Sequence, residues 1–194
     1  MKSVNVVITV ALWAVVFGLG YYLYKQVEEP VTFESNLVQR SDATKNRLLD
    51  IKVAQEYYKQ QHRTYASNFD DLINTVKNEK LRIIKTIGDP DDTTAVVTYD
   101  TIYVPILQDI MDKKKFKGTK TVDELRYIPL TNNLLFEMAM DTIQQQRVEL
   151  SVFEAKATKV KYLSGLDADR IANPVIQDLS IGSLENASGK GSWE

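Results

Sequence analysis

The sequence predicts an α+β fold: an N-terminal transmembrane helix, then a long amphipathic helix packed on a mainly antiparallel β-sheet. Three observations lead to this fold class. An uncharged apolar run lies near the amino terminus, a stretch with helical periodicity follows it, and several later segments are rich in β-branched and aromatic residues. The order of these segments predicts one folded domain behind an anchor.

Composition limits what the chain can be. Its 194 residues leave roughly 160 for one globular domain after the anchor. A net charge of −2 supplies no positive field for nucleic acid, which is therefore not an expected partner. Cysteine is absent, which excludes thiol catalysis, disulfides and thiolate zinc sites. No cofactor, metal site or catalytic constellation is predicted.

The anchor is predicted over residues 4–24, which are uncharged. As a helix they would span about 31 Å, close to the roughly 30 Å of a bilayer's hydrocarbon core. Tyr21, Tyr22, Tyr24 and Lys25 would mark the outer membrane interface. Gly18 and Gly20 would allow close packing of helices in the membrane. The alternative interpretation of this segment is a cleaved signal peptide.

Charge around the anchor predicts its orientation. Lys2 lies before the apolar run, whereas Glu28 and Glu29 follow Lys25, so the positive-inside bias keeps residues 1–3 in the cytoplasm. The expected location is a bacterial inner membrane, crossed once, with the C-terminal domain in the periplasm. Pro30 is expected to break the helix and to define a stalk over residues 25–35.

The domain is predicted over residues 36–182, and its first helix ends near residue 61. Leu48, Ile51, Ala54 and Tyr58 recur at intervals of three and four, the spacing of one buried helix face. The remaining faces are expected to carry polar residues: Lys45, Arg47, Lys52, Gln55, Glu56 and Lys59. A second helix should begin near Ser67 as its cap, with a buried stripe of four residues: Phe69, Leu72, Ile73 and Val76.

Strands are expected after these two helices. Two of them, at 81–87 and 95–104, should form a hairpin or neighbouring strands, and further strands are predicted at 125–128, 134–140 and 147–157. A short helix is predicted at 106–111 and an exposed loop at 112–120. Asp167 should cap a last short helix, and residues 183–194 should be a flexible tail.

The stretch from Arg47 to Lys77 resembles the soluble part of type IV pilins and type II secretion pseudopilins. As in those proteins, a Tyr-rich helix end precedes a Tyr, a Ser or Thr cap and an Asp-Leu helix start. The matching residues are Ala54, Tyr57, Tyr58, Tyr65, Ser67, Asp71 and Leu72. In pilins the N-terminal hydrophobic segment and the soluble helix are continuous. The whole layout also resembles uncharacterised anchored envelope proteins of Gram-negative bacteria.

Candidate contact and ligand residues form three groups. A basic cluster near a bilayer could contact headgroups or an acidic partner, and it comprises Lys113, Lys114, Lys115, Phe116, Lys117 and Lys120. His62, the only histidine, lies at a helix end, where a capping role is expected. Asp89, Asp91 and Asp92 surround Pro90 without the spacing of an EF-hand loop, so a solvated turn is expected there.

These features predict a non-enzymatic membrane subunit that scaffolds or regulates an envelope assembly through its extracytoplasmic domain. Its expected partners are the lipid bilayer, other membrane or envelope proteins, and further copies of itself. The alternative is a tethered sensor or ligand-binding domain, which would need a concave, aromatic-lined pocket in the sheet region.

Overall fold

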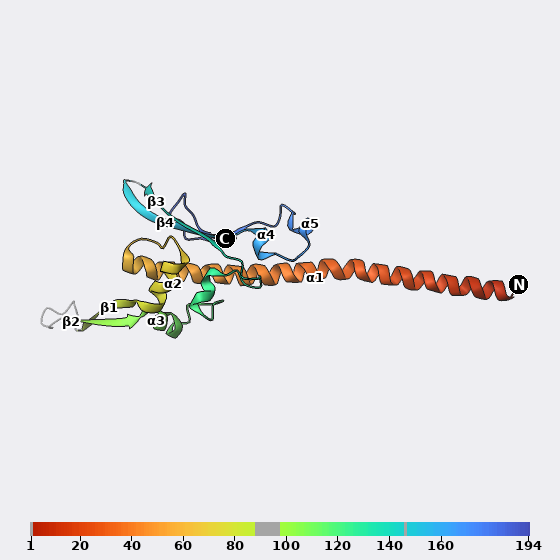
Figure 1. Cartoon of the computed structure of the whole chain (residues 1–194), viewed down its shortest axis with the longest axis horizontal. Helices are drawn as coiled ribbons and strands as arrows, with labels where there is room; N and C mark the ends of the chain where they lie inside the picture. Colours follow the sequence, from red (N-terminus) through yellow and green to blue (C-terminus); the bar gives the residue numbers. More distant parts are fainter. Residues whose placement is uncertain (1, 88–97, 146) are drawn as a thin grey trace. The chain divides into compact units, whose positions relative to one another are not determined.

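The computed structural model describes residues 2–87, 98–145 and 147–194, and within them the side chains of all but residues 2–7, 9–10, 26–30, 85–87 and 98–99. The chain is α+β, with a two-stranded and a three-stranded sheet whose strand pairs are all antiparallel (Figure 1). It divides into two compact units, the first up to Gln39 and the second from Arg40 to Glu194. Asp89, Asp91 and Asp92 lie outside the described residues.

Helix α1, Lys2–His62, is continuous over 61 residues and contributes to both units. The predicted break at Pro30 and the stalk over residues 25–35 are therefore wrong. A proline in a helix interior removes one backbone hydrogen bond and costs about 3 kcal/mol. Residues on both sides of Pro30 continue the helix, so this local cost does not end it.

The predicted transmembrane helix is also wrong. Among the described residues, no helix carries an apolar stretch long enough to cross a membrane. This finding overturns the anchor over residues 4–24 and, with it, the single-pass inner-membrane location.

The second unit is built on the C-terminal part of α1. Leu48, Ile51 and Ala54 are buried, as the periodicity predicts, but Tyr57 occupies the next buried position and Tyr58 is half-buried. Helix α2, Phe69–Asn78, buries Leu72, Ile73 and Val76. Its cap is one residue later than predicted, because the Asn68 side chain, not Ser67, accepts the Asp71 amide.

Strands β1, Lys80–Ile87, and β2, Thr98–Pro105, pair over eight residues each, as predicted for neighbouring strands. Helix α3, Ile106–Asp112, follows at the expected place. The predicted strand at 125–128 is instead the 3₁₀ helix η1, Val122–Arg126, followed by a single bridge between Tyr127 and Leu135. The backbone hydrogen bonds of η1 are made within the turn, from the Glu124 amide to the Thr121 carbonyl and from the Tyr127 amide to the Glu124 carbonyl. The apolar Leu125 is therefore buried without pairing of this segment to a neighbouring strand.

The second sheet has the order β3, Glu137–Gln145, then β4, Val148–Ala157, then β5, Leu179–Gly182. Two short helices, α4, Lys159–Tyr162, and α5, Ala168–Ile171, connect β4 to β5, and Asp167 caps α5 as predicted. The predicted flexible tail instead turns back on β5. The Gly182 amide donates to the Lys190 carbonyl and the Ser192 amide to the Ser180 carbonyl.

Candidate functional site

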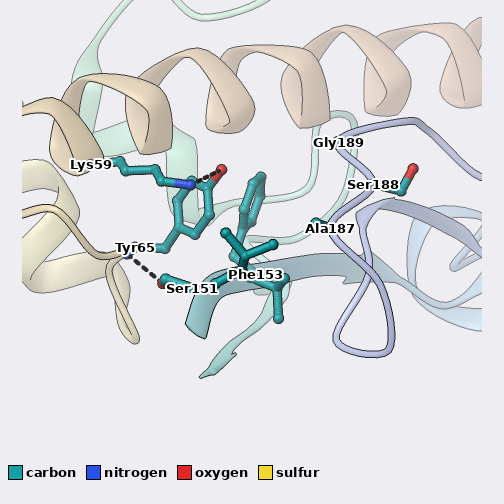
Figure 2. A pocket seen from close by; sticks show the side chains of 9 residues that line it. Lys59, Tyr65, Ser151, Phe153, Ala187, Ser188 and Gly189 are labelled. Atoms are coloured by element: carbon teal, nitrogen blue, oxygen red, sulfur yellow. Dashed lines mark hydrogen bonds between the residues drawn. The ribbon is translucent and has the colours of Figure 1, made fainter. Parts of the chain in front are cut away.

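A small pocket lies between α1, the start of β4 and the returning tail (Figure 2). Its volume is about 70 Å³. The lining residues come from three separate parts of the second unit: Lys59, Tyr65, Leu150, Ser151, Val152, Phe153, Ala187, Ser188 and Gly189. Because drug-sized ligands fill roughly 300–1,000 Å³, this pocket admits only a small chemical group.

Two hydrogen-bonding side chains hold the aromatic wall of the pocket in place. Gln55, buried on α1, accepts the Ala66 amide at 2.8 Å and donates to the Ala66 carbonyl at 3.0 Å. The Ser151 hydroxyl on β4 accepts the Tyr65 amide at 3.1 Å, so the segment after α1 is fixed from both sides. The Tyr65 ring consequently packs on Phe153, with 4.6 Å between ring centroids.

Lys59 provides the charge of the pocket. Its Nζ atom lies 4.3 Å from the centroid of the Tyr65 ring and donates to the Tyr65 hydroxyl at 3.3 Å (Figure 2). Within the described part of the chain, Lys59 forms no ion pair. Lys59 is the one charged side chain among the lining residues, so an anionic group would suit this pocket better than a cationic one.

The basic cluster is only partly free for a partner. Lys113 pairs with Asp109 at 2.6 Å, and Lys115 lies 4.7 Å from the centroid of the Tyr57 ring. Phe116 is half-buried, which does not suit an exposed aromatic anchor. All five lysines of the cluster are exposed, and its predicted contact role stays a prediction.

Asp50, on α1, holds residues 117–119 of the loop that carries the basic cluster. Its carboxylate is buried and accepts three hydrogen bonds of 2.7 to 2.8 Å, from the Lys117 and Gly118 amides and the Thr119 hydroxyl. Gly118 allows this approach, because a Cβ atom there would lie 3.2 Å from that of Asn46. These donors occupy three of the roughly four acceptor sites of the carboxylate, so Asp50 positions the loop.

Arg47, one turn before Asp50, holds the next segment. It donates to the carbonyls of Gly118 and Glu124 and to the Glu124 carboxylate, while its buried Nε atom has no partner among the described residues. Burial lowers the pKa of Arg47, and the charges of Glu124 and Asp50 oppose that shift. The arginine thus remains a structural cation.

Like Asp50 and Arg47, Tyr57 is a buried residue of α1 with a polar contact, which it makes with Asp109 on α3. The tyrosine hydroxyl donates to Asp109 Oδ2. Burial, together with this hydrogen bond, raises the pKa of Tyr57. The hydrogen bonds from Lys113 and then Tyr57 lower the pKa of Asp109. The pair is therefore a neutral phenol on a carboxylate at neutral pH.

His62, at the end of α1, contacts three other side chains. Its Nε2 atom lies 3.1 Å from Glu79 Oε1 and 3.4 Å from the Thr75 hydroxyl, and its ring packs on Tyr58. These contacts connect the end of α1 to the end of α2. In the described residues, no group of three or more histidine, aspartate and glutamate side chains is arranged to hold a metal.

The candidate residues of the first unit all lie on α1. Gly18 and Gly20 are two residues apart, so about 200° separates them around the helix axis and they mark nearly opposite sides. A Cβ atom at either would contact nothing within 4 Å. Tyr21, Tyr22, Tyr24 and Lys25 are exposed. The packing role of the glycines stays a prediction.

The sequence does not single out Phe153, Ser188 or Asp50, and it places Arg47, Gln55 and Lys59 on the helix faces other than the apolar stripe. At about 100° per residue, Arg47, Asp50 and Gln55 fall within the sector of the helix that Leu48, Ile51, Ala54 and Tyr57 occupy, but polar residues there do not by themselves indicate burial. Comparisons with models of known protein families, with curated proteins and with solved structures found no significant match. Function must therefore be argued from the geometry of this chain.

Proposed function

We propose that this protein is a non-enzymatic subunit of a larger protein assembly, in which the N-terminal part of α1 packs among helices of neighbouring subunits. The observation that supports this is the exposure of its large apolar side chains. Eleven of them are exposed between residues 8 and 24: Ile8, Leu12, Trp13, Val15, Val16, Phe17, Leu19, Tyr21, Tyr22, Leu23 and Tyr24.

These side chains surround the helix. Successive residues turn by about 100°, so Leu12, Trp13 and Val15 already point to three different sides. A soluble surface helix is apolar on one face, whereas a helix that is apolar all round is normally buried on every side. Several neighbouring helices would bury this segment better than a single partner face.

The pilin resemblance supports the same proposal. The family resembled by residues 47–77 has a hydrophobic N-terminal segment that continues into the helix of its soluble part. Here α1 is likewise uninterrupted from Lys2 to His62. The polar groups buried in the second unit also support a non-enzymatic role, because Asp50, Gln55 and Asp109 are engaged by hydrogen bonds within the chain.

The test uses single cysteines in a chain that has none of its own. Gly18→Cys and Gly20→Cys place a thiol on nearly opposite sides of α1, where the added atoms meet no neighbour. Mild oxidation should yield disulfide-linked chains from at least one of them. Val175→Cys, an exposed position in the second unit, is the matched control and should stay unlinked.

A second set of variants tests whether apolar packing holds the assembly together. Leu12→Gln, Val16→Gln and Leu19→Gln, combined, alter one stripe of α1 and should shift the sedimentation coefficient toward that of a monomer. Val160→Gln, equally exposed in the second unit, should not. If the wild-type chain sediments as a monomer and neither Gly18→Cys nor Gly20→Cys forms a disulfide-linked dimer, the proposal is overturned.

A second candidate function is binding of a small anion in the Lys59 pocket. The unpaired ammonium beside two aromatic rings favours this activity. Acetate titrated into the chain should change the fluorescence or the NMR signals of Tyr65, and Lys59→Gln should remove that change. Lys45→Gln, on the same helix about four turns earlier, where it pairs with Asp42, is the control, and equal responses in both variants would reject this candidate.

A further inference from the structure

The β1–β2 sheet is unusual because it has only two strands in the described part of the chain. An isolated pair of strands is marginally stable in water and normally gains a third strand or a helix to cover its face. One face of this pair is half-buried and apolar, with Leu81, Ile83, Ile102 and Val104. The other face exposes Ile84 and Tyr103.

The hydrogen bonds at the start of the sheet show which backbone groups point outward. The Ile106 amide donates to the Glu79 carbonyl, so residues 79 and 106 face each other through their backbone groups. Backbone groups alternate along an antiparallel ladder. With the register of Arg82 against Tyr103, the backbone N–H and C=O of Thr101 and Tyr103 therefore point away from β1.

The outer edge of β1 is better protected than that of β2. Gln61 Nε2 donates to the Lys80 carbonyl at 2.9 Å, so the first outward group of β1 is already occupied. Lys80 and Arg82 also place exposed positive charges along this strand. Lysine and arginine on an edge strand oppose pairing with another chain. The described part of β2 has one charged residue, Asp100, beside Thr101, Ile102 and Tyr103.

We propose that β2 pairs with β2 of a second copy of this chain, antiparallel and about a two-fold axis. The combined sheet has the order β1, β2, β2 of the partner subunit, β1 of the partner subunit. Its half-buried apolar faces then join into one surface, and both of its outer edges are the charged β1 strands. Pairing through β1 instead would bring Lys80 and Arg82 close to their copies.

The outward groups restrict the register of this dimer. Residues whose backbone groups point outward must face each other across the axis, so the axis passes near residues 101 to 103. Head-to-tail pairing of β1 with the partner subunit's β2 would leave an open edge at each end and would produce fibres. The two arrangements differ in which positions approach their own copies.

The experiment is a disulfide scan of the full chain with single cysteines at Thr101, Ile102 and Tyr103, and with Arg82→Cys as the control. Arg82 is the register partner of Tyr103 on the same exposed face. We expect a disulfide between copies at one or two of the β2 positions and at least about tenfold less at Arg82. If a disulfide forms only when the Arg82→Cys chain is mixed with a chain carrying one of the β2 cysteines, β1 pairs with β2 of the partner subunit and the two-fold arrangement is overturned.

Proline substitutions test the backbone pairing itself. Tyr103→Pro and Arg82→Pro each remove one outward N–H and leave the inward ladder intact. Tyr103→Pro should reduce the link at position 101 or 102 about tenfold, whereas Arg82→Pro should leave it within about twofold. If both proline variants lose the disulfide link equally, pairing through the β2 edge is rejected. Each variant is shown to be folded if its unfolding transition, followed by Trp193 fluorescence, is the same as that of the parent chain.

This interface is independent of the apolar part of α1. The scan is therefore repeated in the combined Leu12→Gln, Val16→Gln and Leu19→Gln chain. A β2 link that persists there supports the hairpin dimer even if the helix proposal fails. A glycine link without any β2 link gives the opposite result and rejects the hairpin dimer.

Discussion

The two parts of α1 differ in what covers their apolar side chains. In the second unit Leu48, Ile51 and Ala54 are covered by the chain itself. In the first unit Leu12, Val16 and Leu19 have the same helical conformation and remain exposed. The comparison teaches that helix formation and burial are separate requirements: the C-terminal part of α1 meets both within its own chain, whereas the described N-terminal part meets only the first.

Polar residues reinforce this difference. Thr44, Arg47, Asp50 and Gln55 are buried on the C-terminal part of α1, where each has hydrogen-bond partners in the second unit or along the helix. Hydrogen bonds to these partners offset the free-energy cost of removing the polar groups from water, and they fix how each loop lies on the helix. The described positions 11–24 carry no charged residue and have no comparable network.

The largest expected effect comes from removing the Asp50 carboxylate. Asp50→Ala leaves two amides and a hydroxyl without their buried acceptor, and we expect a loss of about 3 to 5 kcal/mol in the free energy of unfolding. Urea unfolding followed by Trp193 fluorescence in a Trp13→Phe background measures it. Asp42→Ala, an exposed acid on the same helix, should change it by under about 0.5 kcal/mol.

A matched pair of leucines tests the comparison directly. Leu48→Ala opens a cavity and should cost about 2 to 5 kcal/mol, because Leu48 is 0% exposed. Leu12→Ala, at a residue 61% exposed, should leave unfolding of the second unit within about 0.5 kcal/mol. The same urea titration compares both, and equal losses would mean that the first unit is part of the core of the second.

The Tyr57–Asp109 contact should make stability depend on pH at the acidic end. A carboxylate with a lowered folded pKa stabilises the fold above its unfolded pKa of about 4, and this contribution declines below that pH until it is lost as the pH falls through the folded pKa. Asp109→Asn should therefore cost about 1 to 3 kcal/mol at pH 7, and this cost should decrease steadily as the pH is lowered below about 4. Asp112→Asn, exposed at the end of α3, should change the free energy of unfolding at pH 7 by under about 0.5 kcal/mol.

The smallest expected effect concerns the basic cluster. Lys115→Gln removes the contact with the Tyr57 ring and should cost about 0.5 to 1 kcal/mol. Lys114→Gln should have almost no effect on stability, because its side chain is exposed. If thermal unfolding shows equal shifts for both variants, Lys115 does not differ from the exposed lysines beside it.

Local patterns predicted the local features of this fold. The spacing of Leu48, Ile51 and Ala54 identified the buried helix face, and composition identified β1, β2, α3 and the Asp167 cap. Asp50 could not be recognised, because its partners lie 67 to 69 residues away in the chain. The short strand β5 escaped prediction for a similar reason, since its four residues depend on pairing with β4 and the tail.

The predictions for the first unit failed for another reason. Pro30 adds one local free-energy cost to the helix, whereas the continuity of α1 depends on the summed helical stability of many residues around it. The apolar composition of residues 4–24 predicts a membrane span, but among the described residues no helix is long and apolar enough to be one. The pocket around Lys59 joins α1, β4 and the tail, and no single segment carries a signature of it.

The most direct test of the account compares two exposed valines, one in each unit. Val16 is 58% exposed and Val160 is 66% exposed in the single chain. Val16→Cys and Val160→Cys, each purified as the native assembly, are treated with a water-soluble maleimide. We expect Val160→Cys to react rapidly and Val16→Cys to be protected at least about tenfold until the assembly is dissociated. Equal rates in the native protein would contradict the claim that partner helices cover the first unit.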